Sequence, residues 1–367
     1  MKKYDFVHFF LMDSFVFNSS VKNLIENNDN QHKHLFIFRF ESTDGSCVDE
    51  NLKYIKSIEK YLEIGKYIVI HGLKYKERQI LRIKDRFASR IIWCVWGSDL
   101  YPSPKYEAYT RIKKTIKYTL RLITGEPIVK LLVNKKIGKF KAIFFGFPGD
   151  KYIINDRFGD EIKIYNALYP IGVFSSDIEK ILGDKEGLIC ENKVGYKKLM
   201  LGHSAFPFLK HKKWLEILRN YNKKLELHLP LSYGDKKYAD SIERKCVTQQ
   251  GDNIHIVRNL MTTEEYVKYL NGIDWAVFDF NHQAAFGNMI LLFYLKKRVY
   301  LPEDSIMFKT FRDMGLKVFN LNRLLDDLQE TNINDDLSVN YVYAKNLIDK
   351  NNIIEQWKNA FDRVLQE

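Results

Sequence analysis

Short apolar runs alternate with amphipathic segments along this 367-residue chain, and this alternation constrains its fold more than any other feature. The runs are rich in β-branched and aromatic residues, as is typical of strands buried on both faces of a parallel sheet. The first half predicts strands at 6–12, 35–40, 67–71, 91–95 and 142–145, with helices at 18–27, 52–62 and 76–87 between them. An irregular stretch at about 171–194 interrupts the pattern and predicts a domain junction.

The same alternation then begins again. The second half predicts strands at 198–201, 225–229, 254–257, 275–280 and 298–301, with helices at 209–219, 238–248 and 262–270 and an apolar helix ending at 295. Two successive arrays of this kind favour an α/β protein with two Rossmann-like domains facing across a cleft. We expect domains at 1–175 and 176–338, followed by a helical segment at 339–367.

The formal net charge of +12 is unevenly distributed. The segment 105–141 holds eleven Lys and Arg residues against two Glu residues, which is a net charge of +9. An apolar stripe at helical spacing accompanies these charges between Tyr109 and Ile123. An amphipathic basic helix suits an anionic partner such as a membrane surface, a pyrophosphate or a nucleic acid. A solvated helical face, or a stripe packed into a core, is the structural alternative.

Several functional classes lack their sequence signals. No secretory leader is expected, and the longest uncharged run, 280–295, is shorter than the roughly 20 residues of a membrane span. The four cysteines show no framework spacing, which predicts reduced thiols in a cytoplasmic protein. The chain has no G-x-G pair, no P-loop, no G-x-S-x-G elbow and no D-x-D pair. We therefore expect no cofactor and no metal, and any bound pyrophosphate would need backbone N–H groups and helix N-termini.

Polar residues in the first half follow the ends of predicted strands, where ligands bind in open parallel sheets. Asp13, His71 and Asp99 hold such positions, and together they could supply a general base for an acceptor hydroxyl. Asp99 lies in the stretch 91–102, read as IIWCVWGSDLYP, in which two indoles and a phenol accompany the acid. The alternative is a buried strand that ends in a helix cap at Ser98 or Asp99.

The second half offers a possible phosphate site. Gly202-His203-Ser204 lies between a predicted strand and a helix, where Gly202 permits close backbone approach and the other two can donate hydrogen bonds. The turn 283–288, read as QAAFGN, opens the apolar helix, and Pro230–Gly234 offers Tyr233 for stacking or a hydroxyl contact. Plain strand–turn–helix connections and helix–sheet packing are the alternatives.

These motifs together carry a family resemblance. W-x-x-W-G-S-D-L-Y, the H-G pair at His71, G-x-S, P-x-x-Y-G and Q-x-x-x-G occur here in a series between about residues 8 and 319. The series resembles the bacterial TDP-N-acetylfucosamine:lipid II N-acetylfucosaminyltransferases, also called 4-alpha-L-fucosyltransferases. The resemblance implies a GT-B fold, with an acceptor domain, a nucleotide-sugar domain and a C-terminal helix that crosses back to the first. It also implies metal-independent transfer of a deoxy or deoxy-amino sugar from a dTDP donor to an undecaprenyl-pyrophosphate-linked glycan in surface polysaccharide synthesis.

The resemblance also implies roles for particular residues. Donor binding is expected from two loops and one helix start: Gly202, His203, Ser204, Pro230, Tyr233, Gly234, Gln283, Phe286, Gly287 and Asn288. Acceptor binding is expected from His8, Gly72, Trp96 and Tyr101. This chain departs from the family pattern at Leu11, His282, Ala285 and Asn288, and the last three lie near the expected donor site.

We therefore expect a glycosyltransferase that sits peripherally on the inner face of the cell membrane through its basic segment 105–141. One alternative is a non-catalytic protein that binds nucleic acid through its positive charge and its 22 tyrosines. Another is a GT-B sugar-nucleotide epimerase or phosphorylase that uses the same kind of cleft.

Overall fold

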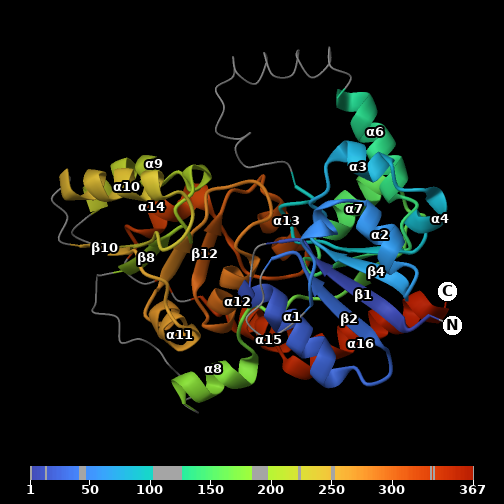
Figure 1. Ribbon diagram of the computed structural model, residues 1–367. Helices are drawn as coiled ribbons and strands as arrows, with labels where there is room; N and C mark the ends of the chain where they lie inside the picture. Colours follow the sequence, from blue (N-terminus) through green and yellow to red (C-terminus); the bar gives the residue numbers. More distant parts are fainter. Residues whose placement is uncertain are drawn as a thin grey trace. The chain divides into compact units, whose positions relative to one another are not determined.

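The computed structural model describes residues 2–12, 15–40, 47–101, 126–183, 197–221, 225–248, 253–330, 333 and 335–366 (Figure 1). The chain divides into two compact units. The first unit comprises Met1–Gly172 together with Lys350–Glu367, and the second comprises Val173–Asp349. No helix in the described ranges combines the length and the apolar character that crossing a bilayer requires.

The first unit is built on a seven-stranded parallel sheet in the order β3-β2-β1-β4-β5-β6-β7. Its strands are β1 (Tyr4–Phe10), β2 (His34–Phe38), β3 (Cys47–Val48), β4 (Gly65–His71), β5 (Ile91–Cys94), β6 (Ala142–Phe145) and β7 (Ile164–Asn166). Its helices are α1 (Phe15–Asn28), α2 (Lys56–Tyr61), α3 (Glu77–Leu81), α4 (Asp85–Ala88), α6 (Glu126–Ile137), α7 (Asp150–Phe158) and α16 (Lys350–Gln366).

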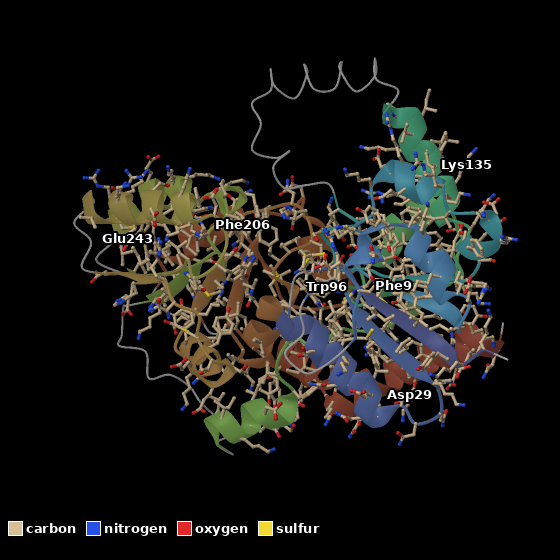
Figure 2. The ribbon with its side chains drawn as sticks, viewed as in Figure 1. Phe9, Asp29, Trp96, Lys135, Phe206 and Glu243 are labelled. Carbon is tan, nitrogen blue, oxygen red and sulfur yellow. The ribbon has the colours of Figure 1, made fainter. Side chains whose placement is uncertain are left out.

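Helices cover both faces of this sheet, as the apolar strands predict. Phe9 of β1, labelled in Figure 2, packs edge-on against Tyr61 of α2, with ring centroids 5.3 Å apart. Phe6, three residues earlier on β1, points to the other face, and its ring centroid lies 4.5 Å from that of Phe361 on α16. Because successive strand residues point to opposite faces, α2 and α16 lie on opposite sides of the sheet.

The second unit repeats this plan with a six-stranded parallel sheet in the order β10-β9-β8-β11-β12-β13. Its strands are β8 (Lys197–Leu201), β9 (Leu225–Pro230), β10 (Ile254–Val257), β11 (Trp275–Val277), β12 (Arg298–Leu301) and β13 (Phe319–Asn320). Its helices are α8 (Ser175–Leu182), α9 (His211–Leu218), α10 (Lys236–Thr248), α11 (Thr263–Asn271), α12 (Phe286–Tyr294), α13 (Ile306–Asp313), α14 (Leu324–Asp327) and α15 (Ser338–Leu347).

Both sheets have the strand order of a doubly wound fold, in which ligands bind where the order reverses. The reversal lies between β1 and β4 in the first unit and between β8 and β11 in the second. The expected α/β class with two Rossmann-like halves is confirmed. The carboxyl ends of these two strand pairs are therefore the places to look for function.

The C-terminal segment divides between the units. Helix α15 belongs to the second unit, where Tyr341 packs against Tyr294 of α12 with ring centroids 5.2 Å apart. Helix α16 returns to the first unit, where the Trp357 indole donates a 2.9 Å hydrogen bond to the carbonyl of Leu168. The crossing helix expected at the end of the chain is thus present and begins at Lys350, so residues 339–349 stay with the second unit.

Some elements differ from the sequence predictions. The helix expected at 76–87 is two short helices, α3 and α4, and the irregular stretch at 171–194 contains α8. The stripe expected at 109–123 lies outside the described residues, as does Asp13. Within the basic segment, the structure describes residues from 126 onward, where α6 lies against α3.

Candidate functional site

The loop after β8 occupies the reversal point of the second sheet. Gly202 leaves the strand with φ +70°, and its N–H donates to the Val277 carbonyl of β11 at 2.9 Å. A Cβ at this position would lie 2.9 Å from His211 Nε2, so both the backbone conformation and the space favour glycine. The next two side chains, His203 and Ser204, are buried.

The Nδ1 atom of buried His203 has no hydrogen-bond partner among the described residues. The buried hydroxyl of Ser204 makes no well-formed hydrogen bond there, although the Tyr233 hydroxyl approaches it. Burial lowers the pKa of His203 to about 3, and neighbouring His211 and His282 add to the effect, so the imidazole is neutral. Buried polar atoms are nearly always paired, because an unpaired one costs about 1–3 kcal/mol. A polar group of a ligand could form the hydrogen bonds that these atoms lack.

The loop after β9 packs directly on this loop. The Ala205 N–H donates to the Tyr233 carbonyl at 2.7 Å, and the Asp235 N–H donates to the Ala205 carbonyl at 2.9 Å. A Cβ on Gly234, which has φ +114°, would lie 2.8 Å from the Ala205 carbonyl oxygen. Glycine is therefore required for the two loops to pair, and the pairing brings Tyr233 to Ser204.

Helix α12 brings the third motif to the same place. The Tyr233 hydroxyl approaches both Ser204 and Asn288, and Asn288 accepts a 2.7 Å hydrogen bond from the Tyr266 hydroxyl. The helix begins at Phe286 after Ala285, whose φ of +54° is unusual for a residue with a Cβ, and no described side chain caps this end. The N-terminus of α12 thus points its partial positive charge at the loop cluster.

The structure therefore assembles the three predicted donor motifs in one cluster of the second unit. Gln283, Gly287 and Asn288 are half-buried, Tyr233 is 46% exposed, and His203 and Phe286 are buried. Pro230 is the last residue of β9 and is buried, so it shapes the loop and does not face a ligand.

The sequence analysis missed a charged group beside this cluster. Asp279, just after β11, is buried and accepts hydrogen bonds from the Lys210 and Lys213 ammonium groups at 2.7 and 3.1 Å. The Trp214 indole donates to the same carboxylate at 3.0 Å. These donors outweigh the effect of burial and hold the pKa of Asp279 below its ordinary value. Its position after a buried strand, like that of Asp99, was the available signal.

In the first unit, Asp99 ties two loops together. Its Oδ2 atom accepts from the Leu73 N–H at 2.8 Å and from the Trp93 indole at 2.7 Å, and its Oδ1 atom accepts from the Trp96 N–H at 2.9 Å. The carboxylate therefore bridges the loops after β4 and β5. Three fixed donors to one half-buried carboxylate are typical of a positioning residue.

His71 and His8, predicted to face a ligand, are instead buried in the first unit. The Tyr169 hydroxyl bonds to His71 Nδ1, and His71 Nε2 lies 2.9 Å from His8 Nδ1. Burial lowers the pKa of His71 to about 3 and that of His8 well below its ordinary value. We therefore correct both assignments to core residues under α16, because their strand positions point into the packed face.

The remaining acceptor candidates differ in accessibility. Trp96 is half-buried, and its ring meets that of half-buried Tyr169 edge-on, with ring centroids 5.2 Å apart. Gly72 has φ +75°, and a Cβ there would lie 2.9 Å from Met12 Cγ. Tyr101 is buried and donates to Asp150 at 2.7 Å, so it is corrected to an internal contact.

The fold is similar to several solved structures at low identity. A glycosyltransferase from Rickettsia africae matches with a TM-score of 0.61 and 11% identity, covering 100% of both chains. A putative UDP-N-acetylglucosamine 2-epimerase from Listeria monocytogenes gives 0.57 and 12%, covering 99% of this chain and 97% of the other. A trehalose-6-phosphate protein structure from E. coli, bound with UDP-2-fluoro glucose, gives a TM-score of 0.58 and 10% identity, covering 99% of each chain. No protein-family model matches the chain. These similarities show a GT-B fold.

Proposed function

We propose that this protein is a glycosyltransferase whose second unit binds a nucleotide-diphosphate sugar. One observation carries the proposal: the buried His203 Nδ1 atom has no partner in the described structure, and it lies with the buried Ser204 hydroxyl at the strand-order reversal, beside the N-terminus of α12. The E. coli structure of the same fold holds a nucleotide-sugar analogue, which supports this reading. By the family resemblance, the donor is a dTDP-linked deoxy or deoxy-amino sugar of the fucose type.

In this proposal the loop cluster holds the leaving diphosphate. Negative charge grows on the diphosphate as the glycosidic bond breaks, and fixed N–H and hydroxyl donors stabilise it without reorganisation. Ser204 and the first turn of α12 would supply these donors, and Lys210 and Lys213 would add positive charge nearby. The chain's own groups then replace a metal ion, as the missing D-x-D pair indicates.

We assign the acceptor to the carboxyl end of the first unit's sheet. Trp96 and Tyr169 form a half-buried aromatic pair there, and the Tyr169 hydroxyl is held by His71. Because His71 fixes its position, this hydroxyl can hydrogen-bond to an acceptor hydroxyl and orient it. Asp99 would act through the loops it joins.

Contact with an anionic membrane is the remaining part of the proposal. Helix α6, within the basic segment, exposes Ile128, Leu131 and Leu132 to 65%, 55% and 47%. These residues are spaced at one helical turn, and Lys135, labelled in Figure 2, lies on the same face of the helix. An exposed apolar stripe accompanied by a lysine is typical of a helix that lies in a membrane interface. A lipid-linked glycan acceptor fits this location.

Nucleotide binding by the full chain tests the donor assignment. A thermal-shift panel of dTDP, UDP and GDP, with CMP for contrast, should show stabilisation by at least one diphosphate. Ser204→Ala should weaken its binding about 10–100-fold, because a hydrogen bond to a charged group contributes about 1.5–3 kcal/mol. Ser241→Ala is the matched control, since the Ser241 hydroxyl of α10 donates only to the Tyr238 carbonyl at 2.7 Å. No diphosphate binding, or an equal loss in both variants, would refute the assignment.

The similarity to a putative epimerase makes epimerisation of a nucleotide sugar the second candidate activity. An epimerase would use the same nucleotide-diphosphate cluster without a second substrate. Chromatography of the products from a labelled nucleotide sugar, which resolves isomers of equal mass, separates the two activities. Release of nucleoside diphosphate with a lengthened glycan supports the transferase, and an isomeric nucleotide sugar would replace it with the epimerase.

A further inference from the structure

A cluster of metal-ligating side chains lies in the first unit, at the far end of the hydrogen-bonded row of histidines from Tyr169. Asp29, His32 and His34 occupy the connection from the end of α1 to the first residue of β2. Asp29 and Trp96 lie near opposite ends of α1 in Figure 2. The Asp29 Oδ2 atom is 2.8 Å from His32 Nδ1 and 3.1 Å from His34 Nε2. All three ligand atoms lie within 4.8 Å of one another.

We propose that Asp29, His32 and His34 form a binding site for a divalent transition-metal ion, with Zn²⁺ as the preferred ion. Two imidazoles and one carboxylate are a donor set that suits zinc, whereas calcium and magnesium prefer oxygen ligands alone. Tetrahedral zinc with bonds of about 2.0–2.1 Å separates its ligand atoms by about 3.3 Å. The observed separations need only a small expansion to admit the ion.

The surroundings of the cluster strengthen the case. Metal-bound histidines nearly always use their second ring nitrogen in another hydrogen bond. Here His32 Nε2 lies 3.1 Å from the Asp362 carboxylate of α16, and His34 Nδ1 lies 2.9 Å from His8 Nε2. The second oxygen of Asp29 accepts from the Gln31 and His32 N–H groups at 3.2 and 3.4 Å. Each ligand is therefore already oriented by a second partner.

The hydrogen-bonded row of histidines can adapt to the ion. With a metal on His34 Nε2, the proton of that ring moves to Nδ1 and points to His8. His8 can accept it, because a neutral imidazole carries one donor and one acceptor nitrogen. A small, mainly apolar cavity between α1 and α16 borders the cluster at Asp29.

A second cluster in the second unit provides a useful contrast. Glu226, His228 and His255 also bring three ligand atoms together on β9 and β10. However, the other ring nitrogen of His228 is buried with no partner in the described structure, and His255 is 52% exposed. The Lys198 ammonium also lies 3.8 Å from the same Glu226 oxygen, where it would repel a cation. We therefore assign the metal to the first cluster, and the second serves as its control.

The consequence of the site concerns the crossing helix. Asp362 of α16 bonds to a metal ligand, so the ion would link α16 to the connection between α1 and β2. A ligand that binds only the folded state stabilises it in proportion to its free concentration. The hydrogen bonds from His34 through His8 and His71 end at the Tyr169 hydroxyl, so the ion would also influence the proposed acceptor site. The nucleotide experiment concerns the second unit and tests the proposed donor site separately.

The test uses the full chain, stripped with a chelator and dialysed, and titrated with Co²⁺ and Zn²⁺. We expect one Co²⁺ per chain with the visible absorption of a tetrahedral site, displaced by Zn²⁺ with a rise in melting temperature. His32→Ala should abolish the signal, and His255→Ala should leave it unchanged. Asp362→Asn, at a 39% exposed position, should fold normally and weaken binding about 10–100-fold.

Each outcome decides the question. Absence of stoichiometric metal binding by the wild-type chain would overturn the proposal. Binding that survives His32→Ala and is lost in His255→Ala would move the site to the second cluster and overturn it equally. Circular dichroism of each stripped variant verifies folding, and Asp362→Asn alone remains a decisive comparison if His32→Ala does not fold.

Discussion

The role of a single carboxylate in this protein depends on the hydrogen bonds that it accepts. Asp99 and Asp150 both follow strands in the first unit, yet Asp99 accepts three hydrogen bonds while buried Asp150 accepts from the Tyr101 hydroxyl and stands at the start of α7. Position after a strand predicted that acids would gather at this edge. The sequence position could not show how many hydrogen bonds each carboxylate accepts, because the donors come from segments distant in sequence.

The three hydrogen bonds that Asp99 accepts lead to a prediction about stability. Asp99→Asn replaces one accepting oxygen by an NH₂ group, which must then face an N–H donor. We expect the free energy of unfolding to fall by about 1–3 kcal/mol, the cost of an unsatisfied buried polar group. Chemical denaturation of the variant measures this, with Asp235→Asn at an exposed loop position as the control. An undiminished stability with complete loss of transfer would instead make Asp99 the catalytic base.

Asp150 predicts a dependence of stability on pH. Burial, its largest cause, raises the pKa of Asp150 to about 7, whereas the unfolded chain has the ordinary value of 3.8. Between these values the folded state binds more protons than the unfolded state, so stability falls as pH rises from about 4 to 7 and then levels. At 1.36 kcal/mol per unit, the change is at most about 4 kcal/mol.

Denaturation across that pH range measures the Asp150 effect. Asp150→Asn should flatten the fall while leaving the Tyr101 contact possible through its amide oxygen. Asp160→Asn, at an exposed position in the same unit, is the matched control and should keep the wild-type slope. A slope unchanged in Asp150→Asn would show that other groups cause the dependence.

Elements with a strong local pattern were predicted well. Strands β6, β10 and β12 have the bounds that the sequence predicts, because they are apolar runs between charged or glycine-containing turns. Strands β3, β7 and β13 were not predicted, since two or three residues at or near a sheet edge carry no measurable periodicity. The histidine row was also missed, because its members meet only through the register of neighbouring strands.

Helix α6 supports a prediction at the scale of one element. Replacing Leu131 and Leu132 by Ser should weaken binding to anionic vesicles by about tenfold or more, because each buried leucine contributes about 1.5–3 kcal/mol of apolar transfer. A vesicle sedimentation assay at low salt measures the change. Val247→Ser on α10, where the valine is 74% exposed, is the control and should bind as the wild type does. Equal binding by both variants would remove α6 from the membrane contact.

At the scale of the whole molecule, both units have the strand order of a doubly wound fold, but different kinds of side chain lie at the reversal point of each sheet. The second unit brings buried polar side chains and a helix N-terminus to its reversal point, whereas the first fills that region with aromatic rings and paired histidines. The predicted donor loops therefore meet in space, while two of the predicted acceptor residues, His8 and Tyr101, are buried. Sequence patterns located both edges but did not separate ligand-facing side chains from core ones.

Calorimetric titration of the full chain in EDTA tests the central claim most directly. The chain's own donors, rather than a cation, are proposed to hold the terminal phosphate of the nucleotide. A nucleoside diphosphate of the preferred base should therefore bind at least tenfold more tightly than its monophosphate, with no gain when Mg²⁺ is added in excess of the EDTA. Equal affinities for the two nucleotides, or binding that appears only with Mg²⁺, would contradict the account.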